Sequence, residues 1–287
     1  SAAAPGHWTR LYGSSKALVI SRVAAEVAAP LIVVTTDSLQ AGRLEEELAF
    51  YLGKQSVIEI LTFPDWETLP YDLFSPYQDI ISERLATLAR LPSLERGILV
   101  VPVTTLMHRL LPQEYLAARS LMLTTGQRLD IDRFRQELAT AGYVFVPQVM
   151  EHGDAAIRGS LIDIFPMGAA QPFRLDLFDD AIDSIRTFDP ETQRTTDQLR
   201  ALDLVPVSEL QLTTETIKRF RRGYVEAFGA PTTDDMLYAA VSEGRRHPGM
   251  EHWLPLLHER METIFDYVPG SPVVLEPQDE DAGHERL

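Results

Sequence analysis

The 287-residue sequence contains no cysteine, which excludes disulfides, thiolate nucleophiles and cysteine-ligated zinc sites. It also lacks an apolar run of ~18 residues, the length that a membrane-spanning helix needs, so no membrane is expected as a partner. The first residues, SAAAPGHW, do not have the basic and apolar regions of a secretory signal. Together these absences favour a cytoplasmic protein.

Cations are scarce as well. The chain has 26 Lys and Arg against 42 Asp and Glu, a formal net charge of −16. Binding to nucleic acid without sequence preference depends on a basic face that releases counterions, so a direct DNA-binding module is disfavoured, although a local basic patch remains possible. The 45% hydrophobic content is sufficient for the cores of two or three globular domains.

Motifs for catalysis and metal binding are also missing. The seven histidines show no H-E-x-x-H spacing, and no G-x-S-x-G nucleophile turn is present. Asp179, Asp180 and Asp183 are close in sequence, but exposed acids in a hairpin turn explain them better than a general acid/base pair. We therefore predict no catalytic residues and no metal site.

A phosphate-binding loop has one candidate, around Gly13, Ser15, Lys16 and Ala17. A working loop reads G-x-x-x-x-G-K-[ST], in which glycine amides hold phosphate and the final hydroxyl binds Mg²⁺. Ser15 replaces the second glycine, and Ala17 removes the hydroxyl. The pattern indicates a degenerate P-loop that opens a helix, so no cofactor is expected. An active ATP-dependent helicase or nuclease subunit is the alternative, which measurable ATP affinity would favour.

Hydrophobic periodicity divides the chain into segments. Residues 1–118 alternate helix and strand patterns, which predicts an α/β lobe with a parallel sheet covered on both faces. The expected strands are 31–36, 57–63 and 97–103, and the expected helices are 16–29, 38–52, 79–91 and 104–111.

Residues 119–205 change to short strands with turn residues between them, typical of an inserted α+β domain. The expected strands are 120–124, 143–147, 159–165, 173–178 and 182–188, with one helix at 131–141 closed by Gly142. Residues 206–275 are mostly helical (214–228 and 234–242), with a possible strand at 272–275, and the acidic tail 276–287 is expected to be disordered.

One strand of the insert carries an interaction signal. Alternation along residues 173–178 places Phe173, Leu175 and Leu177 on one face and Arg174, Asp176 and Phe178 on the other. Arginine and aromatic residues are enriched in the hot spots of protein interfaces. Arg158, at the start of the preceding strand, lies nearby if the two strands pair. The alternative is a solvated sheet face with an Arg–Asp cross-strand pair.

The segment 63–88 is rich in proline and aromatic residues, with Trp66 and Phe74 expected as buried anchors. Its motifs DWETLPYD and SPYQDIIS, together with QVMEHG at 148–153 and RGSLIDIFPMG at 158–168, resemble the N-terminal region of the bacterial transcription-repair coupling factor family (Mfd). That region is in turn similar to the excision-repair protein UvrB.

The resemblance implies a fold and a partner. Residues 1–118 would be a degenerate helicase lobe of the RecA-like P-loop NTPase type, similar to UvrB domain 1a. Residues 119–205 would be a UvrA-binding domain similar to UvrB domain 2, and residues 206–275 a part similar to domain 1b. The UvrA-binding residues carried over are Arg158, Arg174, Asp176 and Phe178. Only the 15 residues 64–78 occupy the place of UvrB's damage-probing hairpin, which is too few for it.

The expected function is that of a non-catalytic adaptor, which recruits UvrA to stalled transcription complexes for nucleotide excision repair by imitating UvrB. ATP, Mg²⁺, RNA polymerase and DNA would be bound by other parts of a longer ATP-dependent DNA translocase. The rest of that chain would mask the UvrA-binding face.

Overall fold

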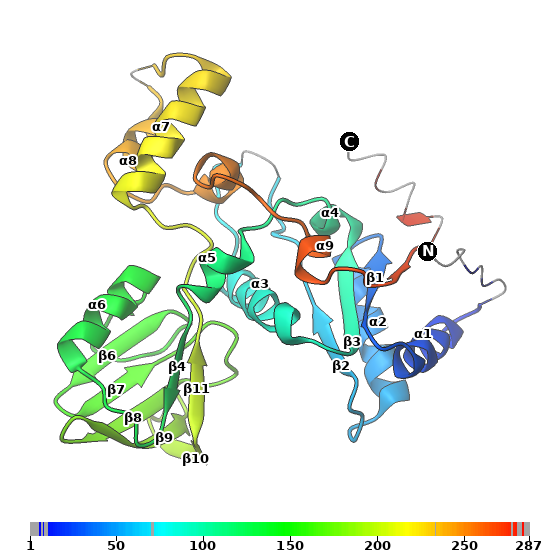
Figure 1. Cartoon of the computed structure of the whole chain (residues 1–287), viewed down its shortest axis with the longest axis horizontal. Coiled ribbons are helices and arrows are strands. Elements are labelled where there is room, and N and C mark those ends of the chain that lie inside the picture. Colours follow the sequence, from blue (N-terminus) through cyan, green and yellow to red (C-terminus); the bar gives the residue numbers. More distant parts are fainter. Residues whose placement is uncertain are drawn as a thin grey trace. The chain divides into compact units, whose positions relative to one another are not determined.

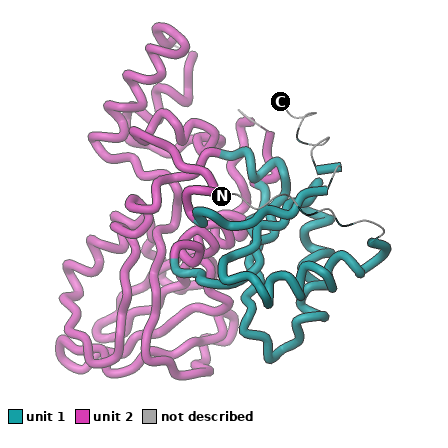
Figure 2. The backbone as a smooth tube through the Cα atoms, turned by 45° about the vertical axis from the view of Figure 1, so that its right-hand side comes forward, with its two compact units in different colours: residues 1–65, 93–108, 268–287 teal, residues 66–92, 109–267 magenta. Residues whose placement is uncertain are grey.

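The computed structural model describes residues 6, 8, 11–69, 72–232, 234–276, 278, 279 and 283. The chain forms two compact units, which Figure 2 colours separately: residues 1–65, 93–108 and 268–287 in the first, and residues 66–92 and 109–267 in the second. Pro70 and Tyr71 of the aromatic segment, and most of the tail expected to be disordered, lie outside the described residues. None of the helices in the described ranges is long and apolar enough to cross a membrane.

The first unit is built on a parallel sheet of order β12-β1-β3-β2 (Figure 1). Every residue of the two central strands, β1 and β3, is buried, as their nearly continuous apolar sequences predict for strands covered on both faces. The strands are β1 (Pro30–Thr35), β2 (Glu59–Thr62), β3 (Gly97–Pro102) and β12 (Val273–Val274).

The helices of this unit bury one apolar side each. Helix α1 (Ser15–Glu26) buries Ala17, Ile20 and Ala24, which join the same core as residues of β1 and β3. Helix α2 (Ser38–Leu52) is capped by Asp37, whose side chain accepts a hydrogen bond from the Gln40 amide at 2.8 Å. Helix α4 (Val103–Leu106) is shorter than the helix expected at 104–111, because Leu110 instead forms an isolated antiparallel bridge with Glu262.

The second unit contains a six-stranded sheet of order β10-β9-β8-β7-β6-β5. Its neighbouring strands are antiparallel except for the pair β5–β6. A separate ladder joins β11 to β4. The strands are β4 (Leu121–Thr124), β5 (Val144–Phe145), β6 (Asp154–Arg158), β7 (Leu161–Ile164), β8 (Phe173–Phe178), β9 (Ala181–Phe188), β10 (Thr195–Leu199) and β11 (Ala201–Leu204).

Two helices of the second unit have well-formed caps, of which the sequence predicted the one at Gly142. Helix α6 ends at Gly142, whose φ of +95° suits glycine, and α7 begins at a capping box formed by Thr213 and Thr216. The helices are α3 (Gln78–Arg90), α5 (Gln113–Ala117), α6 (Ile131–Ala141), α7 (Thr214–Phe228), α8 (Met236–Ser242) and α9 (Ile264–Tyr267), with 3₁₀ turns η1 (Leu91–Ser93) and η2 (Met250–Leu256).

The parallel sheet and the additional strands confirm a mixed α/β fold. The helicase-like character of the first lobe and the segment boundaries at 118, 205 and 275 stay predictions. The expected insert, 119–205, lies wholly within the second unit, whereas β12 lies in the first, where it pairs with β1.

The expectation that Phe74 is a buried anchor was wrong. Trp66 is buried, with the Arg84 guanidinium 5.0 Å from its ring centroid, but Phe74 is 73% exposed. The residues around Phe74 are held by polar contacts: Ser75 Oγ donates to Glu251 Oε2 at 2.8 Å and accepts from the Gly249 amide at 3.2 Å. These contacts fix the backbone beside Gly249 and leave the Phe74 ring in solvent.

Candidate partner-binding site

The two faces of β8 have different environments. Leu175 and Leu177 are buried, whereas Arg174 and Asp176 are partly exposed and Phe178 is 74% exposed. The alternation along this strand therefore separates a core face from an open face, as predicted. Because the strand has neighbours on both sides, these side chains stand on a rigid support.

The strand register brings Asp163 of β7 opposite Arg174. Asp163 is completely buried. Its two carboxylate oxygens accept from Arg174 Nε at 2.7 Å and Nη2 at 2.8 Å, the two-pronged geometry that makes Arg–carboxylate pairs strong. The cross-strand Arg–Asp pair that the sequence analysis gave as the alternative thus exists, between Arg174 of β8 and Asp163 of β7.

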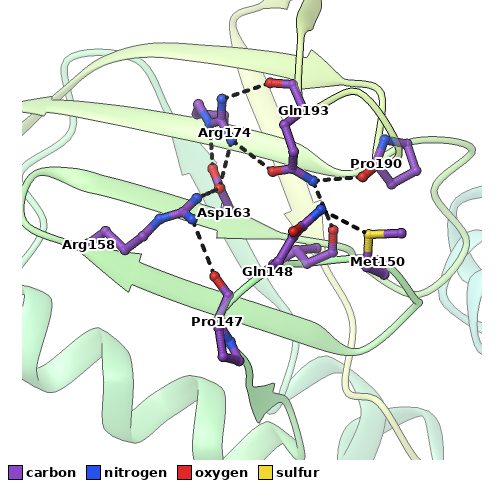
Figure 3. A network of polar contacts seen from close by, with 9 residues as sticks. Pro147, Gln148, Met150, Arg158, Asp163, Arg174, Pro190 and Gln193 are labelled. Atoms are coloured by element: carbon purple, nitrogen blue, oxygen red, sulfur yellow. Dashed lines mark hydrogen bonds and ion pairs between the residues drawn. The ribbon is translucent and has the colours of Figure 1, made fainter.

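Arg158, at the end of β6, binds the same carboxylate. Its Nη2 donates to Asp163 Oδ2, and its Nη1 donates to the carbonyl of Pro147 at 3.3 Å. Figure 3 shows Asp163 between the two guanidinium groups. The two arginines that the sequence analysis singled out therefore converge on one buried anion, which offsets part of their charge.

A hairpin turn holds Arg174 from the other side. Arg174 Nη1 donates to the Gln193 carbonyl at 3.2 Å, and Nη2 approaches Gln193 Oε1 at 3.4 Å (Figure 3). Gln193 has a φ of +60°, and its amide donates to the carbonyl of Asp189 at 2.7 Å. Hydrogen bonds from the amide and hydroxyl of Thr192 hold the pKa of the Asp189 carboxyl below its usual value. The turn is thus ordered by its own contacts.

The electrostatics of Arg174 follow from these neighbours. Its hydrogen bonds to Asp163 raise the pKa of the guanidinium, against the opposing effect of burial. The Phe188 ring lies under the guanidinium, 4.7 Å from Cζ to the ring centroid, a distance at which a cation is attracted to an aromatic face.

Phe178 lies at the opposite end of β8 from Arg174. The Leu177 amide donates to the Ser160 carbonyl at 2.9 Å, which extends the pairing of β7 and β8 to the turn that follows Arg158. Across the neighbouring strands, Asp176 of β8 pairs with Leu161 of β7, and Leu161 pairs with Arg158 of β6. The sheet therefore brings Arg158, Asp176 and Phe178 to one end of the open face.

Sequence reasoning missed Asp163 and Gln193. The tight turn at Gly159-Ser160 was the available signal for Asp163, because pairing Arg158 with Leu161 puts Asp163 on the same face as the arginines. Gln193 had no such signal, since its role depends on a left-handed turn conformation that a glutamine rarely adopts.

Known proteins are similar to this chain over most of its length. A protein-family model described as the UvrB interaction domain matches residues 121–210, a range that contains every residue of the arginine network. The chain is 44% identical over 272 residues to the transcription-repair-coupling factor of Haemophilus influenzae, covering 94% of this chain and 23% of that protein. It is 40% identical over 278 residues to the one of Escherichia coli K12, covering 96% and 24%, and 31% identical over 279 residues to the one of Staphylococcus aureus, covering 93% and 24%.

The chain belongs to the transcription-repair-coupling factor family. It spans about a quarter of the length of the curated relatives it matches. The match to the UvrB interaction domain covers most of the segment 119–205 that the sequence analysis predicted as an insert.

The residues predicted to form a degenerate P-loop lie in the first unit. Lys16 is in the first turn of α1, and its ammonium is 2.9 Å from the Glu276 carboxylate. Ser15 Oγ donates to the Tyr12 carbonyl at 2.7 Å, and Ser14 Oγ lies 2.7 Å from Tyr51 Oη. The charged and hydroxyl groups at the start of α1 are thus engaged by the protein itself. Among the described residues, no group of three or more His, Asp or Glu could hold a metal ion.

Proposed function

We propose that this chain is a non-catalytic adaptor that binds UvrA through the open face of the six-stranded sheet and so recruits it to stalled transcription complexes for nucleotide excision repair. The observation that carries the proposal is the pairing of an exposed ring, Phe178, with a partly exposed cation, Arg158, on the same end of a rigid sheet. Both lie within the match to the UvrB interaction domain.

The composition of this patch suits a protein partner. The Phe178 ring is 74% exposed and so is available to a partner, and hot spots of protein interfaces favour aromatic and arginine side chains in combination. Asp176 adds an acceptor in the neighbouring row. The patch can therefore offer an apolar anchor, a donor and an acceptor to one partner surface.

The proposal also assigns functions to the rest of a longer protein and to the first unit of this chain. RNA polymerase, DNA, ATP and Mg²⁺ would be bound by other parts of a longer, ATP-driven translocase, and the first unit of this chain would be a helicase lobe that has lost its nucleotide site. The rest of that chain would mask the sheet face until transcription stalls. Its compartment would be the cytoplasm, in keeping with a chain that has no cysteine.

Binding of UvrA to a Phe178→Ala variant tests the proposal. A phenylalanine side chain buries about 150–250 Å², so covering the exposed 74% of this one removes roughly 150 Å² from water. At ~25 cal/mol per Å² this is about 3.8 kcal/mol. The β-carbon kept by alanine and the cost of ordering the ring reduce it to ~2 kcal/mol, about 30-fold in affinity.

The measurement is isothermal titration calorimetry of this chain with purified UvrA. Phe50→Ala is the matched control, because Phe50 is 79% exposed but lies on α2 in the other unit, and it should leave the affinity unchanged. Equal affinities of Phe178→Ala and the unchanged chain would refute the place of Phe178 in the site, and an equally unaffected Arg158→Ala would refute the site as a whole.

Two other functions can be separated from this one. An ATP-dependent enzyme would bind ATP with Mg²⁺, but Lys16 is paired with Glu276 and Ala17 offers no hydroxyl. A DNA-binding module would shift duplex DNA in a salt-dependent way. We expect no ATP binding by calorimetry, and no shift of duplex DNA by this chain alone at about 100 μM, the weak end of the Kd range for non-specific DNA binding.

A further inference from the structure

The two arginines that share Asp163 have different surroundings. Arg174 is 19% exposed and makes four hydrogen bonds, two to Asp163 and two to Gln193. A guanidinium has five N–H groups, so only one of those of Arg174 remains for a partner. The ring of Phe188 also faces this guanidinium. Most of the binding capacity of Arg174 is therefore used within the protein.

Arg158 has the opposite character. Its side chain is 48% exposed and makes two hydrogen bonds, to Asp163 and to the Pro147 carbonyl. No third acceptor lies within hydrogen-bond distance of it among the described residues, so three N–H groups remain. Arg158 pairs with Leu161 on the neighbouring strand, and Leu161 pairs with Asp176, which lies near Phe178 at the end of β8.

Asp163 connects the two. It is completely buried, and a buried carboxylate needs partners for both oxygens. Arg174 reaches both of them, whereas Arg158 binds only Oδ2. Removing Arg174 therefore leaves Oδ1 without its donor, so that Asp163 must rotate or admit water. Either change moves the acceptor that holds Arg158.

We propose that Arg174 is a positioning residue, which fixes Asp163 so that Asp163 can orient Arg158, and that Arg158 is the arginine that contacts a carboxylate of the partner. This inference rests on the proposed function, because it assigns roles within the same UvrA-binding face. Arg158 and Phe178 then form the contact, while Asp163, Arg174 and Gln193 form its support.

A double-mutant cycle distinguishes the two roles. If one residue acts through another, mutating both weakens binding little more than mutating one. If the two contact the partner independently, their fold-losses of affinity multiply. The variants are Arg158→Ala, Arg174→Gln and the double variant, with affinity for UvrA measured by calorimetry. We expect Arg158→Ala to weaken binding ~30-fold and Arg174→Gln ~10-fold. The affinity of the double variant for UvrA should be less than ~3-fold lower than that of Arg158→Ala. A loss near ~300-fold, the product of the two, would mean that Arg174 contacts the partner directly and would overturn the inference.

A measurement without the partner provides a second test. The Nε–H signal of Arg158, assigned in ¹⁵N NMR spectra by its absence in Arg158→Ala, should shift and broaden in Arg174→Gln. An unchanged signal would show that Arg174 does not position Arg158. Arg174→Lys, which keeps one charged donor to Asp163, replaces Arg174→Gln in both experiments if circular dichroism shows that the glutamine variant is unfolded.

The results also separate this inference from the proposed function. If neither Phe178→Ala nor Arg158→Ala changes the affinity for UvrA, the binding face itself is wrong and both proposals fall. If these two weaken binding but the effects of Arg158 and Arg174 multiply, only the division of roles is wrong.

Discussion

Truncation of Arg174 should destabilise the second unit even in the absence of any partner. Asp163 is completely buried and receives three hydrogen bonds from the two arginines, and Arg174→Ala removes two of them. A hydrogen bond to a charged group contributes ~1.5–3 kcal/mol, and breaking a buried ion pair from one side costs ~3–5 kcal/mol. Because Arg158 still binds Asp163, the lower end applies, about 3 kcal/mol.

Thermal unfolding followed by circular dichroism measures this loss. For a unit of this size each kcal/mol lowers Tm by ~2–4 °C, so Arg174→Ala should melt about 6–12 °C lower. Arg158→Ala is the control: it removes one hydrogen bond to Asp163 from a half-exposed side chain and should cost ~1.5 kcal/mol, the lower end of that range. Adding Asp163→Ala to Arg174→Ala should recover stability, since no buried charge is then left alone. An Arg174→Ala chain that melts no lower than Arg158→Ala would refute the reasoning.

Two further variants test other parts of the second unit. Gly249 has a φ of +77°, and a β-carbon there would lie 2.0 Å from the Asp72 carbonyl oxygen. Gly249→Ala should therefore lower the free energy of unfolding in urea by ~2–4 kcal/mol. The control Gly13→Ala, at a φ of +56° with free space around it, should lower it by only ~1 kcal/mol, and equal losses would contradict the clash. Burial lowers the pKa of His258 to about 4, so the folded protein keeps the ring neutral while the unfolded chain protonates it below ~6.5. The stability that the neutral His258 contributes is therefore complete above pH ~6.5 and is lost as pH falls towards 4, on the order of 1–2 kcal/mol by pH 5. His258→Gln should lose correspondingly less stability between pH 7.5 and 5. Parallel pH profiles of the two chains would contradict this.

The sequence predicted best where one physical signal dominated. Buried parallel strands such as β1 and β3 have nearly continuous apolar sequences, and α6 and α7 have both amphipathic spacing and caps. The strands β6, β10 and β11 were missed; β11 is only four residues long. β10 is exposed along its whole length and so shows no apolar alternation, and β6 is short with two small alanines at its centre. Their pairing comes from backbone hydrogen bonds, which sequence patterns do not reveal.

The sequence predicted which residues of β8 share the exposed face, but not which partners they bind. Alternation along one strand indicated that Arg174 and Phe178 share a face, and this needs only the two-residue period of a strand. Which carboxylate binds Arg174 depends on the register between β7 and β8, and Gln193 depends on the conformation of a turn. Phe74 shows the same limit, because polar contacts of its neighbours to Gly249 and Glu251 decided its exposure.

A buried carboxylate between two arginines gains little stability overall, because desolvating Asp163 offsets much of the attraction, and well-packed apolar side chains of similar volume would often be as stable. The value of this arrangement must then lie in what it orders. Arg174 is fixed by Gln193 and by the Phe188 ring, Asp163 is fixed by Arg174, and the remaining lone pairs of Asp163 fix the one guanidinium that stays half in solvent. An arginine held in one orientation loses less conformational entropy when a partner carboxylate binds it. The buried charge is therefore explained by Arg158, at the end of the sheet where Phe178 is exposed.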